Sequence, residues 1–119
     1  MALRSIIPII RSFDEHVAHA FYLEFLGFKL DWKHQFETDL PVYMQISKDN
    51  CILHISEHYG DASPGTSIRI ECDDLKSYHT QLTAKQFKHA RPGISEQPWG
   101  IEMAISDPFG NKLIFFQSN

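Results

Sequence analysis

The chain has 119 residues, of which 43% are hydrophobic, and this length and composition fit one compact domain with a substantial core. Eleven Lys and Arg against fifteen Asp and Glu give a net charge of -4, and without a basic run this balance argues against a nucleic-acid surface. No apolar run is long enough to span a membrane, and the N-terminal stretch lacks the features of a secretory signal. We therefore expect a cytoplasmic domain without nucleic-acid or membrane partners.

The first half of the chain predicts a strand, a helix and three more strands. The first strand, at residues 6–10, contains Pro8. Ser12 is the expected N-cap of the helix, with Glu15 three residues later, and Gly27 ends the helix. The strands that follow are expected at residues 28–36, 42–47 and 51–56, the last two joined by a hairpin turn at residues 48–50.

The second half repeats this order. Residues 67–72 alternate polar and apolar side chains as a half-buried strand does, and residues 73–87 carry Leu75, Tyr78 and Leu82 on one helical face. Further strands are expected near residues 88–91, 101–106 and 112–117, with a turn at residues 107–110. The equivalence of the halves indicates a duplication. It predicts one domain over residues 1–119, with modules at about 1–58 and 66–119 and a linker at 59–65.

The predicted fold class is α+β, with two tandem βαβββ modules forming a curved sheet with a cleft. Each module is too small to cover both faces of its sheet, so one face lies under its own helix and the other needs a partner. A homodimer would supply a second pair of modules. Pro8 is then a candidate hinge for exchange of the first strand, and the alternative is that it marks an edge strand.

Four stretches together resemble the bleomycin resistance proteins, within the superfamily that also contains glyoxalase I and extradiol dioxygenases (the vicinal oxygen chelate superfamily). They are SIIPIIRSFD, FYLEFLGFKLDW, SEHYGDASPG and EQPWGIEMAISDPFGN. The resemblance implies a homodimer that exchanges its N-terminal strand at Pro8. It also implies that a bleomycin-type glycopeptide antibiotic is sequestered in clefts at the dimer interface, without chemistry and without a cofactor.

Ligand binding without chemistry needs stacking rings, negative charge and hydrogen-bonding groups. Trp32, Trp99 and Phe36 are the candidate stacking rings, and Trp99 is framed by Pro98 and Gly100 in a segment with the composition of a turn. The resemblance places Trp99 at the drug-stacking tryptophan and Trp32 at an aromatic residue of the same cleft. It further implies that Asp31, Ser56 and Asp61 lie at the cleft, although the last position also aligns with a gap near Gly65.

A metal-dependent enzyme of the same superfamily, such as a lyase, thiol transferase or dioxygenase, is the main alternative. Its metal ligands would fall at Ile7, His54, Ser67 and Ile114, and only His54 is a good ligand. We therefore predict no metal site and no catalytic residue, with His54 as a ligand-contact candidate on the cleft face. A shift of one residue in strand register would turn His54 away from the cleft. A binder of another aromatic or cationic metabolite is the third possibility.

Overall fold

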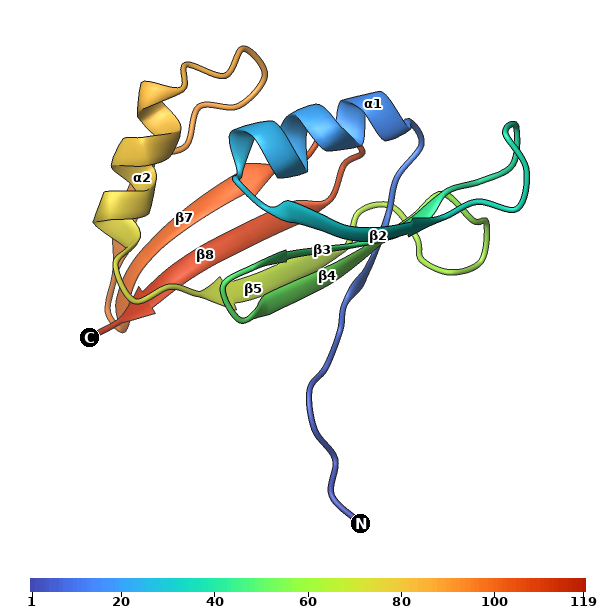
Figure 1. Ribbon diagram of the computed structural model, residues 1–119. Helices are drawn as coiled ribbons and strands as arrows, with labels where there is room; N and C mark the ends of the chain where they lie inside the picture. The colour runs from blue at the N-terminus through green and yellow to red at the C-terminus, as the bar shows by residue number, and fades with distance from the viewer.

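The computed structural model describes residues 1–119 and confirms an α+β fold built from two similar modules (Figure 1). The elements of the first module are β1 (Ile9–Arg11), α1 (Glu15–Ala18), η1 (His19–Phe25), β2 (Lys29–His34), β3 (Tyr43–Lys48) and β4 (Cys51–Ser56). Those of the second are β5 (Ser67–Glu71), α2 (Leu75–Ala84), β6 (Ile94–Gln97), β7 (Gly100–Ser106) and β8 (Lys112–Ser118). The segment η1 is a π-helix that continues α1 without a break. No helix has the length and apolar character needed to cross a membrane.

Each module forms a four-stranded mixed sheet with the same topology. The strand orders are β1-β4-β3-β2 and β5-β8-β7-β6. In both sheets the first strand runs parallel to the last strand of its module, and the other neighbours are antiparallel. The equivalent pairing confirms the duplication inferred from the sequence.

The core lies between the helices and one face of each sheet. On β3 and β4 the alternate residues Met44, Ile46, Leu53 and Ile55 are at most 2% exposed, whereas their neighbours point to the opposite face. A single cluster of 18 buried residues spans both modules. Each large apolar side chain buried in it contributes about 1.5–3 kcal/mol. The alternation therefore fixes which side chains remain on the open faces of the sheets.

Hydrogen bonds between the modules add to this shared core. The Tyr22 hydroxyl donates to Asp107 Oδ2 at 2.6 Å, and the Tyr78 hydroxyl donates to the Leu26 carbonyl oxygen at 2.6 Å. Burial, together with the charge of Asp107, raises the pKa of Tyr22 far above its ordinary value. Helix η1 thus meets the turn between β7 and β8 of the second module, consistent with its place over those strands in Figure 1.

Replacing Asp107 with Ala is expected to destabilise the fold strongly. Besides Tyr22, the carboxylate accepts from the backbone N–H groups of Phe109 and Asn111 and from the Asn111 side chain, at 2.7–2.9 Å. Leaving these buried donors without an acceptor should lower the free energy of unfolding by about 3 kcal/mol or more. Urea denaturation followed by circular dichroism measures this loss. Tyr22→Phe, which leaves Asp107 its other donors, should cost only about 1 kcal/mol, and equal losses would contradict this account.

The predicted start of the first helix was wrong. Asp14, not Ser12, is the N-cap, and its Oδ1 accepts from the Val17 backbone N–H at 3.1 Å. Ser12 is buried and still extended, because its backbone N–H donates to the Ser56 carbonyl oxygen at 2.9 Å. Pairing with β4 therefore keeps the chain out of the helix for two more residues.

The strand predicted near residues 88–91 was also wrong, and the strand lies at Ile94–Gln97 instead. Pro92 and Gly93 interrupt the chain after Arg91, and β6 must end where it can pair with β7. Gln97 pairs with Gly100 across the two-residue turn of Pro98 and Trp99. The pairing of the hairpin thus decides the position of this strand.

The first strand is shorter than predicted and starts later. It covers only Ile9–Arg11, and the segment before it, which we call the N-terminal arm (residues 1–8), extends away from the body of the molecule (Figure 1). Ile6 in the arm is 90% exposed. Pro8 stands at the point where the arm leaves, and its carbonyl oxygen still accepts from the His54 N–H at 3.0 Å.

Candidate functional site

The open faces of the two sheets carry the polar and aromatic side chains that point away from the helices. Face 1, on β2, β3 and β4, consists of Asp31, Trp32, Tyr43, Gln45, Ser47 and His54. Face 2, on β5, β7, β8 and the β6–β7 turn, consists of Arg69, Trp99, Glu102 and Phe116. The strand register is the one the sequence predicted for His54, because Leu53 and Ile55 on either side of it are buried.

A β-bulge brings both Asp31 and Trp32 to face 1. Strict alternation would put these neighbours on opposite faces, but the register between β2 and β3 shifts between Leu30 and Trp32. Asp31 therefore reaches Gln45, while the Trp32 ring stacks on the Tyr43 ring with centroids 6.0 Å apart. Trp32 keeps 44% of its surface exposed, so one side of the ring is open to a ligand.

The polar groups of face 1 form one continuous chain of hydrogen bonds. Gln45 Nε2 donates to Asp31 Oδ2 at 3.0 Å, so its Oε1 is the acceptor for His54 Nε2 at 2.9 Å. Burial lowers the pKa of His54 and favours the neutral imidazole, and in the tautomer with its proton on Nε2 the Nδ1 atom accepts from the Tyr43 hydroxyl at 2.6 Å. Ser47 Oγ also donates to Asp31, at 3.0 Å.

The carboxylate of Asp31 is the last acceptor in this series of hydrogen bonds. The hydrogen bonds from Gln45 and Ser47 lower the pKa of Asp31, so the group carries its negative charge at neutral pH. Asp31 is exposed, and it has further lone pairs for a ligand that donates hydrogen bonds. Face 1 therefore offers an open indole next to a fixed anion.

The neutral state of His54 predicts a pH dependence of stability. Burial lowers the pKa of His54 below its ordinary value of 6.5, so below that pH the unfolded chain binds more protons than the folded one. The free energy of unfolding should therefore fall as the pH is lowered through about 6.5, and this contribution should stay constant above that pH. Urea denaturation between about pH 5 and pH 8 measures the slope, which His54→Gln should reduce. The exposed His16 provides the control, since His16→Gln should leave the slope unchanged.

Trp99 is held in place on face 2 by its neighbours. It lies in the two-residue turn between β6 and β7 and is 49% exposed. Its indole N–H donates to Glu102 Oε2 at 3.1 Å. Asn119 fixes the turn itself, since its backbone N–H donates to the Trp99 carbonyl oxygen at 2.8 Å and its side chain donates to the Pro98 carbonyl oxygen at 3.0 Å. The ring is thus exposed but not free to move.

Gly100 allows the Trp99 turn to lie close to the last strand. Its φ is 154°, and a Cβ atom at this position would clash with the Gln117 carbonyl oxygen of β8. Any other residue would push the hairpin away from β8. The sequence Pro98-Trp99-Gly100 therefore places an indole at the edge of face 2, because Pro98 and Trp99 form the turn and Gly100 allows it to pack against β8.

The remaining predicted residues lie at the margin of face 1 or outside it. Ser56 is fully buried, and its hydroxyl donates to Asp61 Oδ2 at 2.7 Å, so it can hold Asp61 but is not open to a ligand. Asp61 is exposed, and its charge, after burial, contributes to the raised pKa of Tyr43. Phe36 is 74% exposed beyond the end of β2, where its ring contacts His34 and not Trp32.

Six residues of the two faces were not predicted from the sequence as site residues: Tyr43, Gln45, Ser47, Arg69, Glu102 and Phe116. All of them occupy the alternate positions of strands whose intervening positions are mostly apolar and are buried or partly buried. That period of two was the available signal. Their partners lie on other strands, which the sequence does not reveal.

His54 is the one good metal-ligand candidate among the positions considered in the sequence. His54 uses both ring nitrogens in the hydrogen bonds to Tyr43 and Gln45. No group of three or more His, Cys, Asp and Glu side chains has an arrangement that could hold a metal ion. The chemistry on offer at face 1 is therefore stacking, hydrogen bonding and the charge of Asp31.

The two faces do not meet within one chain. No hydrogen bond, ion pair or ring contact joins a side chain of face 1 to one of face 2. Each face thus presents one exposed tryptophan and one or more carboxylates, without an opposing surface.

Paired βαβββ modules with open sheet faces define the class of fold, and a fold of one class can carry binding sites or active sites. The whole chain, residues 1–119, matches the model of a glyoxalase superfamily protein, and the chain belongs to that superfamily. This confirms the resemblance seen in the sequence motifs. No curated protein matches the chain by sequence.

Solved structures with the same fold include antibiotic-binding proteins. TnmS3, an antibiotic binding protein from Streptomyces sp. CB03234, has a TM-score of 0.78 at 20% identity, over 100% of this chain and 99% of the other. A bleomycin-binding protein in complex with bleomycin has a TM-score of 0.77 at 23% identity, over 98% and 100% of the chains. The bleomycin-binding protein of Streptomyces verticillus, with copper(II)-bleomycin, has a TM-score of 0.75 at 23% identity, over 100% and 99%. At these identities the likeness concerns the fold.

Proposed function

We propose that this protein binds and sequesters a bleomycin-type antibiotic, without converting it, between face 1 of one copy and face 2 of a second. The observation that carries the proposal is that each face holds an exposed tryptophan in a fixed position, Trp32 at 44% and Trp99 at 49% exposure, and lacks an opposing surface in its own chain. Proteins of the same fold that bind bleomycin or another antibiotic support the ligand class.

The two faces suit a flat ligand with a cationic part. A planar heterocycle stacked on an aromatic side chain gains about 1–3 kcal/mol, and a cation over an indole adds about 0.5–2 kcal/mol. Asp31 and Asp61 both lie on the side of face 1 and would meet the cationic part. Because Trp32 and Trp99 are already fixed, little conformational entropy is lost when a ligand binds between them.

The chemistry of the two faces favours sequestration of the ligand without a reaction. His54 is the strongest base on face 1, but the Tyr43 hydroxyl already occupies its acceptor nitrogen. Burial raises the pKa of Cys51, which makes this thiol a poor nucleophile. The side chains that remain available hold a ligand by contact and charge.

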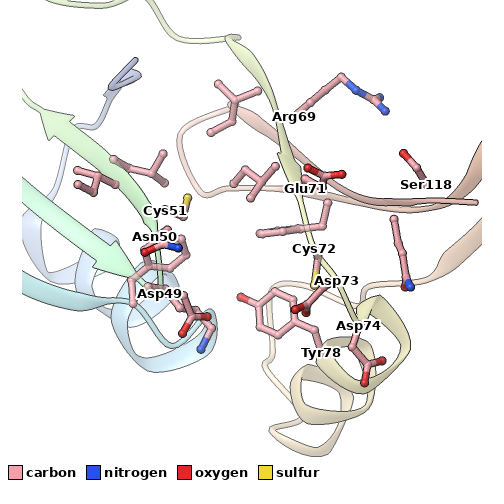
Figure 2. Close-up of a pocket in the computed structure, with 18 of the residues that line it drawn as sticks. Asp49, Asn50, Cys51, Arg69, Glu71, Cys72, Asp73, Asp74, Tyr78 and Ser118 are labelled. Atoms are coloured by element: carbon pink, nitrogen blue, oxygen red, sulfur yellow. The ribbon is translucent and has the colours of Figure 1, made fainter. Parts of the chain in front are cut away.

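A groove between the modules supports a homodimer that exchanges its N-terminal arms, with Pro8 as the hinge. The groove has a volume of about 1080 Å³ and lies between β4 and β5, with Asp49 and Cys51 on one side and Cys72 on the other (Figure 2). The backbone of β5 is unpaired on this side, because β5 is the edge strand of its sheet. On β4, strand β1 pairs only with residues from His54 onward, so residues 51–53 are also unpaired there.

The register of β1 indicates how an arm would fill this groove. Ile9 lies opposite His54, and continuing the same parallel pairing would put Ile7 opposite Ile52. Arg4 would then come opposite Asp49, at the acidic end of the groove. Ile6 and Pro8 line part of the groove of their own chain, but the arm then extends away from the body of the molecule (Figure 1), so we infer that the arm of the second copy fills the rest of the groove. This exchange would hold the two copies together with face 1 of each against face 2 of the other.

A titration with bleomycin tests the proposed function. The purified protein, stripped of metal with EDTA, is titrated while its tryptophan fluorescence is followed, and calorimetry gives the stoichiometry. Quenching that saturates at one drug per chain, with the drug recovered unchanged, is the expected result. Absence of binding would overturn the proposal. A requirement for added metal together with turnover would instead favour an enzyme of the superfamily.

A further inference from the structure

Arg69 lies on β5, the edge strand of face 2, and has unused hydrogen-bonding capacity. Its guanidinium carbon lies 4.5 Å from the centre of the Phe116 ring, so the flat cation covers the ring. One Nη1 N–H donates to Glu102 Oε2 at 3.0 Å. An arginine has five N–H donors, and the others of Arg69 have no acceptor in the protein. The side chain is 47% exposed, so those donors are open to a ligand.

Glu102 holds Arg69 and Trp99 next to one another. The same oxygen, Oε2, accepts from Arg69 at 3.0 Å and from the Trp99 indole at 3.1 Å. The Glu102 side chain is only 16% exposed, so it orients both groups from below and leaves their outer surfaces open. Face 2 therefore presents an indole plane and, beside it, a flat cation.

The charges of the two faces differ in a way that would orient a ligand. On face 2 the charge of Arg69 is balanced by Glu102, but its free N–H groups can still donate. Face 1 has the carboxylate of Asp31, whose hydrogen bonds from Gln45 and Ser47 lower its pKa, and the ammonium of Lys29 lies near this carboxylate on β2. A ligand bound between the faces would meet a donor at one side and acceptors at the other.

We propose that Arg69 forms a subsite for a hydrogen-bond acceptor, which binds a carbonyl or carboxylate oxygen attached to the planar ring that stacks on Trp99. The inference rests on the proposed function and specifies the ligand, namely an aromatic ring with an acceptor close to it and a cationic group further away. Arginine suits this task because its planar N–H groups match the two lone pairs of a carbonyl or the two oxygens of a carboxylate. Arg69 also lines the groove, and Figure 2 shows its side chain directed away from Asp49 and Cys51 on the opposite wall, so the subsite borders the groove.

A purely structural role for Arg69 makes a different prediction. If the side chain only covers Phe116 and pairs with Glu102, its loss should lower stability without changing which ligands are preferred. The subsite instead requires a preference for acceptor-bearing rings that disappears with the guanidinium. The test therefore compares two ligands rather than two stabilities.

The experiment uses acridine and acridine-9-carboxylate as probes. Both titrations follow the indole N–H signals of the dimer by nuclear magnetic resonance, so binding at Trp99 is observed directly. The unaltered protein should bind the carboxylate about tenfold more tightly than acridine. Arg69→Gln should abolish this preference while changing the affinity for acridine less than about twofold. Arg91→Gln, at an exposed arginine outside both faces, is the matched control and should retain the preference.

The outcomes separate this inference from the proposed function. Arg69→Lys keeps the charge but lacks the planar donors, so we expect it to retain only part of the preference for the carboxylate. The same variant replaces Arg69→Gln in the test if Arg69→Gln fails to fold. Equal affinity for both probes in the unaltered protein, or an undiminished preference in the variants, would overturn the subsite even if bleomycin binds. Failure of bleomycin to bind, with the acridine preference intact, would overturn only the proposed antibiotic.

Discussion

Trp99→Ala is expected to weaken bleomycin binding by about 10- to 100-fold while the protein stays folded. The loss corresponds to one stacked ring, worth about 1–3 kcal/mol. Stability should change by less than about 1 kcal/mol, because the ring is 49% exposed and its one side-chain hydrogen bond is to Glu102. Calorimetric titration with bleomycin gives the affinity, and urea denaturation gives the stability of the same preparation.

Two variants make this prediction specific to the ring and its position. Trp99→Phe keeps an aromatic surface and should retain most of the affinity. Val17→Ala, at a residue 40% exposed on α1, removes apolar surface on the helix side of the molecule and should leave the affinity unchanged. Unchanged binding by Trp99→Ala would remove face 2 from the site, and an unfolded Trp99→Ala variant would show that the indole serves the fold.

Features that arise within one stretch of chain could be predicted from the sequence. The duplication was visible in the repeated order of strands and helices, and the strand at Cys51–Ser56 was predicted at its observed bounds, because alternation and turn residues lie in the same window. The exposed turn position of Trp99 was visible for the same reason, since Pro98 and Gly100 flank it. Such local rules are sufficient to place elements and to indicate which residues can lie on an open face.

Features that depend on pairing between distant segments could not be predicted. The β-bulge that puts Asp31 beside Trp32 exists only in the register of β2 against β3. Asp14 replaces Ser12 as the N-cap because Ser12 is held by Ser56, 44 positions later. The hydrogen bond from Trp99 to Glu102 joins residues only three positions apart, so it could have been predicted from the sequence. The position of Arg69 next to Trp99 could not, because Arg69 comes from another strand and binds the same carboxylate. Tertiary pairing thus decides the geometry of both faces.

Deletion of residues 1–7 is expected to convert the dimer to a monomer and to abolish ligand binding. These residues contribute nothing to the buried core, whose first member is Ile10, so each chain should remain folded. Without arms, the groove between β4 and β5 stays empty, and face 1 of one copy is no longer held against face 2 of the other. Sedimentation velocity measures the oligomeric state, and bleomycin titration of the same sample measures binding.

The charge on the arm provides a graded version of the same test. Arg4→Glu would put a second anion opposite Asp49 and near Asp73 and Asp74, so it should weaken the dimer, and more strongly at low salt than at high salt. Ser5→Ala, at the next position, should leave the dimer unchanged. A truncated protein that stays dimeric and binds bleomycin would show that the arm does not join the copies. If it were monomeric and still bound the drug, the faces would have to act within one chain, and the two-copy site would be wrong.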